Sequence, residues 1–359
     1  MEAKRSDKRL VLGLMSGTSL DGLDLAFCEF EQVDEGFLFK IIGAKTVAYT
    51  LLWKKHLSEA KDLKAEAYFE LHAAYGRFLA EEISTFIIAS GLKPEAIASH
   101  GHTIFHRPEL GFSSQLGCGA TIAAKTGLTT VCDFRSLDTA LGGQAAPLVP
   151  IGDKYLFGNY EACLNIGGIA NISVDDTNGN RVAYDVCVAN MLLNYLAEKN
   201  GQAYDKGGEL ARTGNINEGL LSKLNGLSYY SQSGAKSIGR EWFEKEIIPI
   251  IENSKLNNND LLATSTEHVA MIIAKEIDQL NCKQVLLSGG GAFNTFLIEK
   301  LKSKTKAELV IPNESIINFK EALIFAFLGY LRLSGQTNTL QSVTGSSHNS
   351  CGGAVYSGN

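Results

Sequence analysis

The sequence LGLMSGTSLDGLD at residues 12–24 joins two short apolar runs, Leu10–Leu14 and Leu23–Phe27. This pattern predicts a strand, a glycine-rich turn and a second strand. Such a turn exposes backbone N–H groups, and its glycines lack the Cβ atom that would keep a phosphate at a distance. Asp21 and Asp24 add hard oxygen ligands of the kind that hold a hydrated magnesium ion. The turn therefore predicts nucleotide chemistry, and an ordinary hairpin turn is the alternative.

Length, composition and charge define the class of protein. A chain of 359 residues is long enough for two domains of ordinary size. Its content of 45% hydrophobic and 20% charged residues is typical of a soluble globular protein with a full core. The formal net charge of −6, without any basic stripe, predicts no nucleic-acid partner. No apolar run approaches the roughly 20 residues that span a bilayer, so we expect no membrane partner.

Cysteine usage and the first residues of the chain predict the compartment. The seven cysteines are an odd number and form no CxxC pair, which argues against a disulfide framework. The charged segment Met1–Arg9 lacks the apolar core of a secretory signal. We therefore expect a cytoplasmic protein.

A second strand–turn–strand pattern follows in the middle of the chain. It comprises Glu161–Ile166, the turn Gly167-Gly168 and Ile169–Val174. Strands and helices alternate in both halves, which makes the protein α/β. Two phosphate-facing hairpins predict a two-domain, duplicated ATPase fold with an interdomain cleft, although two glycine turns can also resemble each other by chance. The expected domains are residues 1–150 and 151–359, and the last helix, over 319–334, is expected to return to domain 1.

Three histidines lie within the segment Ser99–Pro108. A zinc site is disfavoured because no fourth Cys, Glu or Asp ligand lies nearby in the sequence. A polar wall that hydrogen-bonds a hydroxylated ligand is the better interpretation, with His102 and Thr103 as candidate substrate-binding residues.

Asp133 and Arg135 follow an apolar strand, where ligand-binding loops concentrate in open α/β sheets. Arg135 is suited to a carboxylate or phosphate oxygen, and the alternative is a structural salt bridge with Asp133. Gln144, in the Gly/Ala/Pro-rich connection that follows, is a further candidate for substrate binding.

Asp185 is the candidate catalytic carboxylate. It is expected to end an apolar strand just before a helix over 188–200, where a largely desolvated site would make the carboxylate more basic. The alternative is that Asp185 only caps this helix. Lys236 lies in a segment of charged and aromatic residues that can bind an acidic sugar, with solvated loop charges as the default interpretation.

Three consecutive glycines, Gly289, Gly290 and Gly291, follow the buried strand Gln284–Ser288. Their lack of side chains lets flat groups approach the backbone, so adenine or ribose is the expected guest. Asn294 completes this candidate nucleotide-binding segment.

Taken together, these segments resemble the anhydro-N-acetylmuramic acid kinase family. They occur in the family's order, from residue 10 to about 345. The runs that carry the resemblance are Gly13–Asp24, Ser99–His106, Asp133–Pro150, Asn165–Ser173, the strand with Asp185, Lys236–Phe243, Ser288–Asn294 and Lys320–Leu328.

The resemblance implies a sugar kinase/Hsp70/actin fold that binds ATP with Mg²⁺. It implies that the chain opens the 1,6-anhydro bond of 1,6-anhydro-N-acetylmuramic acid and phosphorylates O6 during peptidoglycan recycling. By this similarity Asp185 is the general base, and a homodimer is possible. Asp21 and Asp24 are the candidates on the metal side, and Arg135 or Lys236 the candidates for the lactyl carboxylate. The residues that would bind the ATP phosphates are Gly17, Thr18, Ser19, Leu20, Asp21, Gly22, Leu23 and Asp24.

The chain departs from the family's pattern in three places. Val186-Cys187-Val188 stands where many members carry Thr-Gly-Pro, and His102 stands where Gln is common. Ser346–Gly358 is divergent and is expected to be mobile. Two other functions stay open at this point: an ordinary sugar or carboxylate kinase, and a non-enzymatic ATP switch of the actin or chaperone type.

Overall fold

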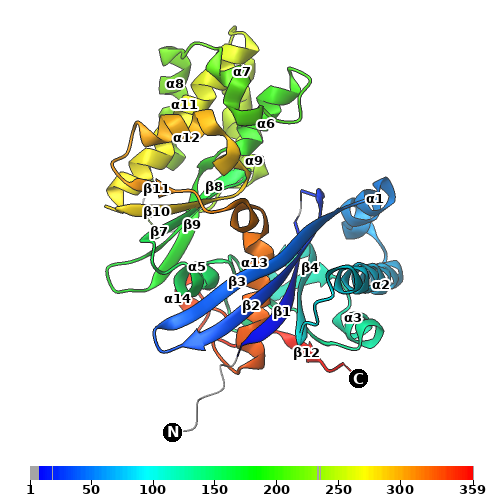
Figure 1. Ribbon diagram of the computed structural model, residues 1–359. Helices are drawn as coiled ribbons and strands as arrows, with labels where there is room; N and C mark the ends of the chain where they lie inside the picture. Colours follow the sequence, from blue (N-terminus) through cyan, green and yellow to red (C-terminus); the bar gives the residue numbers. More distant parts are fainter. Residues whose placement is uncertain (1–7, 18, 233, 235, 359) are drawn as a thin grey trace. The chain divides into compact units, whose positions relative to one another are not determined.

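The computed structural model describes residues 8–17, 19–232, 234 and 236–358. The chain forms two compact units, one containing the residues up to Leu156 and from Phe319 onward, the other containing Phe157–Asn318. Each unit is built on a mixed sheet with helices on its faces, so the predicted α/β class with two domains is confirmed (Figure 1).

The division of the chain differs from the expected one at two points. The sequence predicts a boundary between residues 150 and 151, and the structure places it after Leu156. The helix over 319–334 returns to the first unit as expected, and the residues that follow it, which were assigned to the second domain, belong to the first unit as well.

The first unit contains a seven-stranded sheet. Strands β3, β2 and β1 are antiparallel neighbours, while β1, β4 and β6 run parallel. Two further strands, β5 and β12, pair in antiparallel fashion with β4 and β6. The strands are β1 (Arg9–Ser16), β2 (Gly22–Val33), β3 (Gly36–Ala48), β4 (Ala96–Arg107), β5 (Phe112–Leu116), β6 (Thr129–Cys132) and β12 (Ala354–Tyr356).

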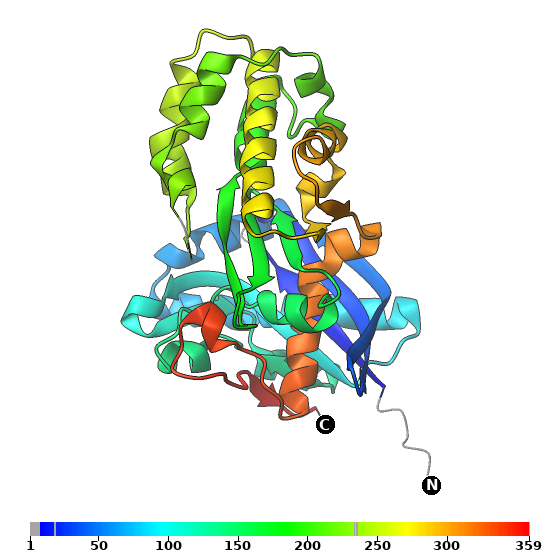
Figure 2. The same ribbon diagram turned by 90° about the vertical axis from the view of Figure 1, so that its left-hand side faces the viewer.

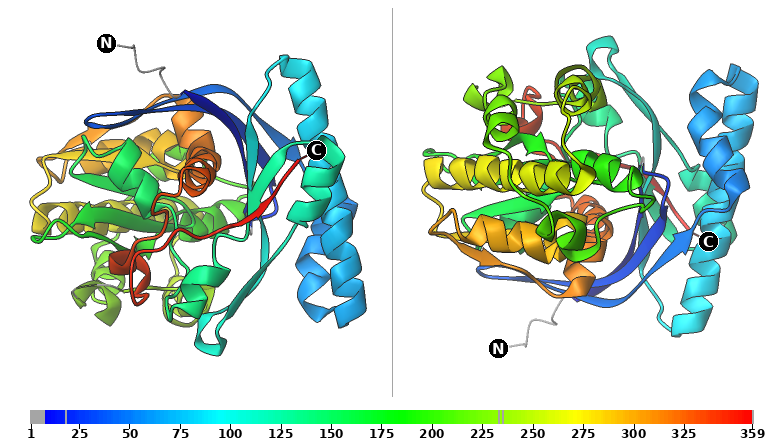
Figure 3. Two further views of the ribbon diagram at one scale, coloured as in Figure 1. Left: turned by 90° about the horizontal axis from the view of Figure 1, so that it is seen from below. Right: turned by 90° about the horizontal axis from the view of Figure 1, so that it is seen from above.

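Helices cover both faces of this sheet. Leu12 and Leu14 of β1 point into a core with Tyr75 and Leu79 of α2, whereas the alternate residues of β1 face α13. Figure 3 shows α2 and α3 on one side of the sheet and α13 on the other. The helices are α1 (Leu51–Glu59), α2 (Ala65–Ser90), α3 (Gly119–Thr126), α4 (Ser136–Ala140), α5 (Pro150–Leu156), α13 (Glu314–Leu333) and α14 (Gln341–Thr344).

Small residues let α13 lie directly on β1 and β4. A Cβ atom at Gly13 would stand 2.0 Å from the carbonyl oxygen of Ala322 and 2.8 Å from the Cβ of Ala326. A Cβ atom at Gly329 would meet the Cβ of Ala98 at 2.5 Å. The sheet and the helix therefore approach each other without room for one more methyl group.

Gly13→Ala is expected to lower the free energy of unfolding by about 1–3 kcal/mol, because the helix must shift to admit the methyl group. Gly43→Ala is the matched control, since a Cβ atom there would meet only Phe27 at an ordinary 3.9 Å. The control is expected to raise the free energy of unfolding by at most about 1 kcal/mol. Urea unfolding of both variants measures the difference, and equal stability of the two would contradict this packing argument.

The second unit repeats the strand order of the first. Its sheet has the order β11-β10-β7-β8-β9, in which β9, β8 and β7 are antiparallel neighbours and β7, β10 and β11 run parallel. Each unit thus has three antiparallel strands followed by two parallel ones, which confirms the predicted duplication. The strands are β7 (Ala162–Ile166), β8 (Ile169–Asp175), β9 (Arg181–Val188), β10 (Gln284–Ser288) and β11 (Glu308–Val310).

The long helix α11 is the centre of the second unit. It contacts β9, α6, α8 and α12, and Figure 2 shows it, in yellow, beside the green strands of the sheet. The helices are α6 (Asn190–Glu198), α7 (Glu209–Arg212), α8 (Glu218–Asn225), α9 (Arg240–Trp242), α10 (Ile248–Glu252), α11 (Asn258–Gln279) and α12 (Thr295–Lys302).

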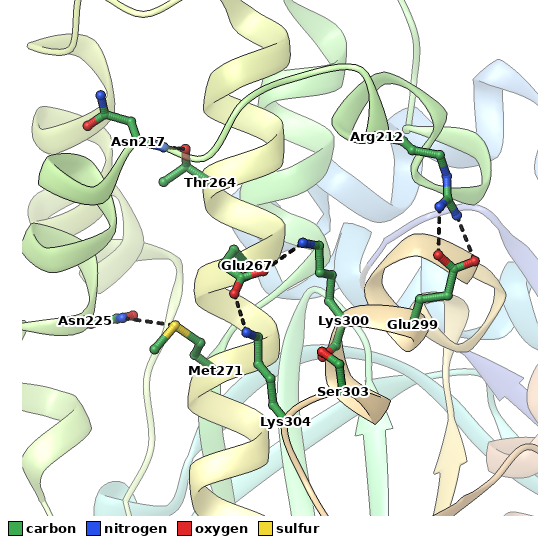
Figure 4. A network of polar contacts seen from close by, with 10 residues as sticks. All are labelled: Arg212, Asn217, Asn225, Thr264, Glu267, Met271, Glu299, Lys300, Ser303 and Lys304. Carbon is green, nitrogen blue, oxygen red and sulfur yellow. Dashed lines mark hydrogen bonds and ion pairs between the residues drawn. The ribbon is translucent and has the colours of Figure 1, made fainter.

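Ion pairs fix α12 to its neighbours. Glu267, a largely buried carboxylate on α11, pairs with Lys300 at 3.3 Å and with Lys304 (Figure 4). Arg212 of α7 donates two hydrogen bonds, of 2.7 and 2.8 Å, to Glu299. This bidentate geometry is the stronger kind of carboxylate pairing.

The segment Ser346–Gly358, which is expected to be mobile, makes defined tertiary contacts in the structure. Within Ser346–Gly358, strand β12 pairs with β6, and the N–H of Gly352 donates to Asn338 at 2.7 Å. A divergent sequence gave no information about these tertiary contacts. No helix in the described part of the chain combines the length and the apolar character that crossing a membrane requires.

Candidate active site

The predicted glycine-rich turn joins β1 to β2. Strand β1 ends at Ser16 and β2 begins at Gly22, and the N–H of Leu20 donates to the carbonyl of Gly17 at 3.3 Å. Leu20 adopts a left-handed conformation with φ 59°, which an L residue takes only where a turn requires it. Ser19 and Asp21 are exposed on the turn, and Thr18 lies outside the described residues.

The glycines and the leucine of this segment have different surroundings. A Cβ atom at Gly17 would meet only Ser19, at 3.5 Å, so the backbone there is open to a ligand. At Gly22 a Cβ atom would stand 2.6 Å from the carbonyl oxygen of Val47, so this glycine is needed for packing. The Leu23 side chain belongs to the core.

Asp24 lies on β2 just beyond the turn. The hydroxyl of Thr46 donates a hydrogen bond of 2.5 Å to its carboxylate. Burial raises the pKa of Asp24, the Thr46 hydrogen bond lowers it, and the nearby Asp21 carboxylate raises it again. Two carboxylates that repel each other favour a divalent cation between or beside them. The described residues include no group of three or more His, Cys, Asp or Glu side chains placed to hold a metal.

Arg135 is held without a carboxylate in contact. Its Nη1 donates to the carbonyl oxygen of Ala145, and its Nη2 donates to Nε2 of His100 at 3.0 Å. Its Nε is buried and has no hydrogen-bond partner. Asp133 instead accepts bonds of 3.2 and 2.7 Å from the N–H and hydroxyl of Ser136 at the start of α4. No ion pair joins Asp133 to Arg135 in the described structure, so the salt-bridge alternative is wrong.

The pKa of Arg135 also depends on Glu321, a residue that is not among the site residues predicted from the sequence. Burial lowers the pKa of Arg135 to about 10, although Glu321 and Asp138 oppose this effect. Glu321 directly precedes the apolar part of α13. Desolvation and, to a lesser extent, the Asp24 carboxylate raise the pKa of Glu321, whereas Lys320 and Arg135 lower it. The first unit therefore places Glu321 within electrostatic reach of both Asp24 and Arg135. The sequence feature that points to Glu321 is the pair of charged residues Lys320 and Glu321 directly before an apolar run.

The remaining predicted substrate-binding residues of the first unit take three different positions. His102 is buried on β4, its Nδ1 is 2.8 Å from the hydroxyl of Ser16, and burial lowers its pKa to about 4. The hydroxyl of Thr103 accepts a long bond of 3.5 Å from Gln115. The Gln144 side chain is exposed, and its backbone N–H donates to the carbonyl of Thr344 at 2.7 Å.

Asp185 lies inside β9, not at the end of a strand. Strand β9 continues to Val188, because Cys187 and Val188 pair with Ala170 and Ile169 of β8. The residue before α6 is Ala189, so the helix-cap alternative for Asp185 is also wrong. A register shift beside Asp185 marks a β-bulge, a feature that commonly re-aims a side chain near a functional site.

The Asp185 carboxylate is fixed through one oxygen. Its Oδ2 accepts bonds of 3.0 Å from the hydroxyl of Ser237 and from the N–H of Ile238. Burial raises the pKa of Asp185, and these two hydrogen bonds lower it. Its other oxygen accepts no hydrogen bond from any described residue. A half-buried carboxylate with one fixed and one free oxygen is able to accept a proton from a bound molecule.

Lys236 holds the segment next to Asp185. Its carbonyl accepts the N–H of Asp185 at 3.0 Å, and its ammonium lies 3.5 Å from the Glu276 carboxylate. The ammonium also lies 6.0 and 5.2 Å from the ring centroids of Tyr184 and Tyr229. Its side chain is only 6% exposed. Glu276 and the two tyrosine rings thus interact with the charge of Lys236 within the second unit. A contact between Lys236 and the substrate stays a prediction.

The predicted second glycine hairpin joins β7 to β8. The carbonyls of Gly167 and Gly168 accept N–H groups of residues 189–191 at the start of α6, at 2.9–3.1 Å. A Cβ atom at Gly168 would meet only Met191, at 3.8 Å. The turn is thus anchored through its carbonyl groups.

The three glycines after β10 are not equivalent. Cβ atoms at Gly289 and Gly291 would stand 2.5 Å from Asn165 and 2.2 Å from Ile166, so both glycines are required by packing on β7. At Gly290 a Cβ atom would meet only an amide nitrogen at 3.8 Å, which leaves this position open. The Asn294 side chain caps α12 by accepting the N–H of Leu297 at 3.0 Å.

Comparison with known proteins relates the whole chain to one family. A family model described as anhydro-N-acetylmuramic acid kinase matches residues 9–358. The anhydro-N-acetylmuramic acid kinase of Aliivibrio fischeri is 36% identical over 372 residues, covering 97% of this chain and 99% of the relative. That of Sulfurovum sp. is 36% identical over 369 residues, covering 98% and 99%.

Solved structures are similar at a more distant level. The (R)-2-hydroxyglutaryl-CoA dehydratase component A of Acidaminococcus fermentans has a TM-score of 0.44 and 14% identity, covering 88% of this chain and 95% of that one. A ROK family glucokinase from Streptomyces griseus has a TM-score of 0.36 and 12% identity, covering 88% and 97%. Similarity at this level does not indicate the ligands or the activity of this chain.

Proposed function

Because the chain belongs to the anhydro-N-acetylmuramic acid kinase family, we propose that it hydrolytically opens the 1,6-anhydro bond of 1,6-anhydro-N-acetylmuramic acid and phosphorylates O6. The products are N-acetylmuramic acid 6-phosphate and ADP, a reaction that belongs to the recycling of cell-wall peptidoglycan. The observation that carries the proposal is the Asp185 carboxylate, fixed at one oxygen by Ser237 and Ile238 and free at the other.

Asp185 acts as the general base in this proposal. Opening the internal acetal requires water to attack C1, and the free carboxylate oxygen takes the proton of that water. Burial supports this role because it raises the pKa of Asp185 and makes the carboxylate a stronger base. The hydrogen bonds from Ser237 and Ile238 oppose this rise in pKa and fix the direction of the carboxylate.

The first unit offers residues that suit a magnesium nucleotide. Asp21 and Asp24 would hold Mg²⁺, since their mutual repulsion is relieved by a cation. The open backbone of Gly17 would face the phosphates, and the open position at Gly290 in the second unit suits the nucleoside. When bound, ATP supplies the phosphoryl group for O6, with its charge neutralised by Mg²⁺ and backbone donors.

Arg135 is the proposed partner of the lactyl carboxylate. A guanidinium has five N–H donors, and the described residues accept only two of those of Arg135. Its buried, unpaired Nε makes a carboxylate ligand favourable, because an unsatisfied buried donor costs about 1–3 kcal/mol. Lys236 is less suited to this role because Glu276 already pairs with its ammonium.

ADP formation with purified 1,6-anhydro-N-acetylmuramic acid tests the proposed function. We expect ADP release that depends on the sugar, together with a product whose mass is that of the sugar plus water plus one phosphoryl group. ADP release that is independent of the sugar would contradict the proposal and favour an ATP switch.

The hydroxyl of Ser237 is expected to set the acid limb of the pH profile. Because its hydrogen bond lowers the pKa of Asp185, Ser237→Ala should raise that pKa. Asp185 works in its ionised form, so the fall of kcat/KM on acidification should move to higher pH in the variant. Ser303→Ala is the matched control, since that hydroxyl donates only to the carbonyl of Lys300. A limb that stays in place in Ser237→Ala would contradict the base role.

Three expectations remain part of this proposal. All seven cysteines are unpaired, which supports a reducing cytoplasm as the place of action. A homodimer remains a prediction, as does the cleft expected between the domains.

A further inference from the structure

A chain of buried side-chain hydrogen bonds runs behind the phosphate turn of the first unit. The hydroxyls of Tyr75 and Tyr49 are 2.6 Å apart, and the Tyr49 hydroxyl donates to that of Ser16 at 2.7 Å. The Ser16 hydroxyl is in turn 2.8 Å from Nδ1 of His102. Ser16, Tyr49, Tyr75 and His102 are all at most 5% exposed. The last residue of β1 is thereby connected to the histidine of β4 that follows a shift in the register between these two strands.

The number of hydroxyl protons limits the directions that these hydrogen bonds can take. Each hydroxyl has a single proton to donate. Tyr49 gives its proton to Ser16, so the proton between the two tyrosines comes from Tyr75. Ser16 keeps its own proton, and Nδ1 of His102, 2.8 Å away, is placed to accept it. Burial lowers the pKa of His102 to about 4, so at neutral pH the ring holds one proton, which is left on Nε2.

His100, two residues earlier on β4, has the opposite arrangement. Its Nδ1 is 2.8 Å from the carbonyl oxygen of Gly101, which can only accept, so Nδ1 carries the proton. Its Nε2 receives an N–H of Arg135, which can only donate. Burial, with Arg135 beside it, lowers the pKa of His100 to about 3, so this ring is neutral as well.

We infer that the Tyr75–Tyr49–Ser16 chain holds His102 in its Nε2–H tautomer, so that His102 is a hydrogen-bond donor to an oxygen acceptor of the bound ligand, while His100 is held in the Nδ1–H tautomer. No described residue accepts a hydrogen bond from Nε2 of His102. The His100 tautomer follows from its two partners, the His102 tautomer is the inference drawn from the chain behind it, and the ligand contact rests on the proposed function. The amide of a Gln side chain, which is common at this position in the family, is a donor too.

Nitrogen NMR of the histidine side chains tests the tautomers without any turnover. Two-bond proton–nitrogen correlations of ¹⁵N-histidine-labelled protein at neutral pH show which ring nitrogen carries the proton, and His102→Gln assigns the signals. We expect Nε2–H for His102 and Nδ1–H for His100 in the same spectrum. A proton on Nδ1 of His102, or on both of its nitrogens, would overturn the inference. Ser16→Ala should remove the preference of His102, whereas Tyr68→Phe, which removes a hydroxyl bonded only to Ser114, should preserve it.

Kinetics tests the donor role separately. His102→Gln keeps an N–H donor and is expected to retain most of kcat/KM. His102→Leu has a side chain of similar size without a donor and is expected to lose about tenfold to a hundredfold. Equal losses in both variants, or none in either, would overturn the donor role even where the proposed reaction itself is observed. Absence of sugar-dependent activity in the unmodified protein would count against the proposed function and leave the tautomer result standing.

Discussion

Asp185→Asn is expected to lower kcat by about a hundredfold to ten-thousandfold, the range that a positioned general base contributes. The amide keeps the shape of the side chain and can still accept the hydrogen bonds of Ser237 and Ile238, but it cannot take a proton from water. ATP affinity, measured by calorimetry, is expected to stay close to that of the unmodified protein, because Asp185 belongs to the chemistry and not to nucleotide binding.

Asp176→Asn is the matched control for this change. Asp176 lies in the turn between β8 and β9, where its Oδ1 accepts the N–H groups of Asn178 and Asn180 at 2.8 Å. The same carboxylate-to-amide change there leaves an acceptor in place, so activity should persist. Retention of more than roughly a tenth of kcat in Asp185→Asn would show that Asp185 is not the base.

Arg135→Lys is expected to raise KM for 1,6-anhydro-N-acetylmuramic acid by about tenfold to a hundredfold, the value of a charge-assisted hydrogen bond to a carboxylate. Lysine keeps the charge, but its single ammonium cannot serve Ala145, His100 and a substrate carboxylate in the planar geometry of a guanidinium. Steady-state kinetics over a range of sugar concentrations gives the change.

A second substrate separates carboxylate binding from a general loss of structure. 1,6-Anhydro-N-acetylglucosamine has no lactyl group, so Arg135→Lys should reduce the preference for the lactyl sugar over this analogue. Arg212→Lys, which changes a partly exposed arginine paired with Glu299, should leave that preference as it is. An unchanged preference in Arg135→Lys would place the carboxylate elsewhere.

The fold could be predicted largely because its signals are local. The two hairpins, residues 9–33 and 162–175, each show an apolar run, a glycine turn and a second apolar run, and both form as expected. The end of strand β9 is harder to predict. The sequence predicts that the strand ends at Asp185, but Val186-Cys187-Val188 is fully buried and continues the ladder with β8. A short apolar run before a helix is consistent with either structure.

The candidate site could be predicted only in part, because its partners come from distant segments. Asp185 was identified, but the hydroxyl and N–H that fix it lie 52 and 53 residues further along the chain. Glu321 lies on a helix whose packing on the first sheet depends on Gly13 and could not be inferred from periodicity. The sequence predicts that the glycines of these turns are open to ligands. In the structure, Gly22, Gly289 and Gly291 are instead required by close packing. The sequence shows which positions lack a side chain, but not whether other protein atoms or a ligand lie beside them.

Turnover in ¹⁸O-labelled water tests the central claim, that Asp185 directs water onto the bridged sugar while O6 is phosphorylated. The account predicts one labelled oxygen in the sugar phosphate, located at C1 by fragmentation mass spectrometry. Unlabelled product incubated in labelled water for the same time gives the background from spontaneous exchange. Phosphorylated product with no label at C1 above that background would contradict the account and favour an ordinary sugar kinase acting on a free hydroxyl.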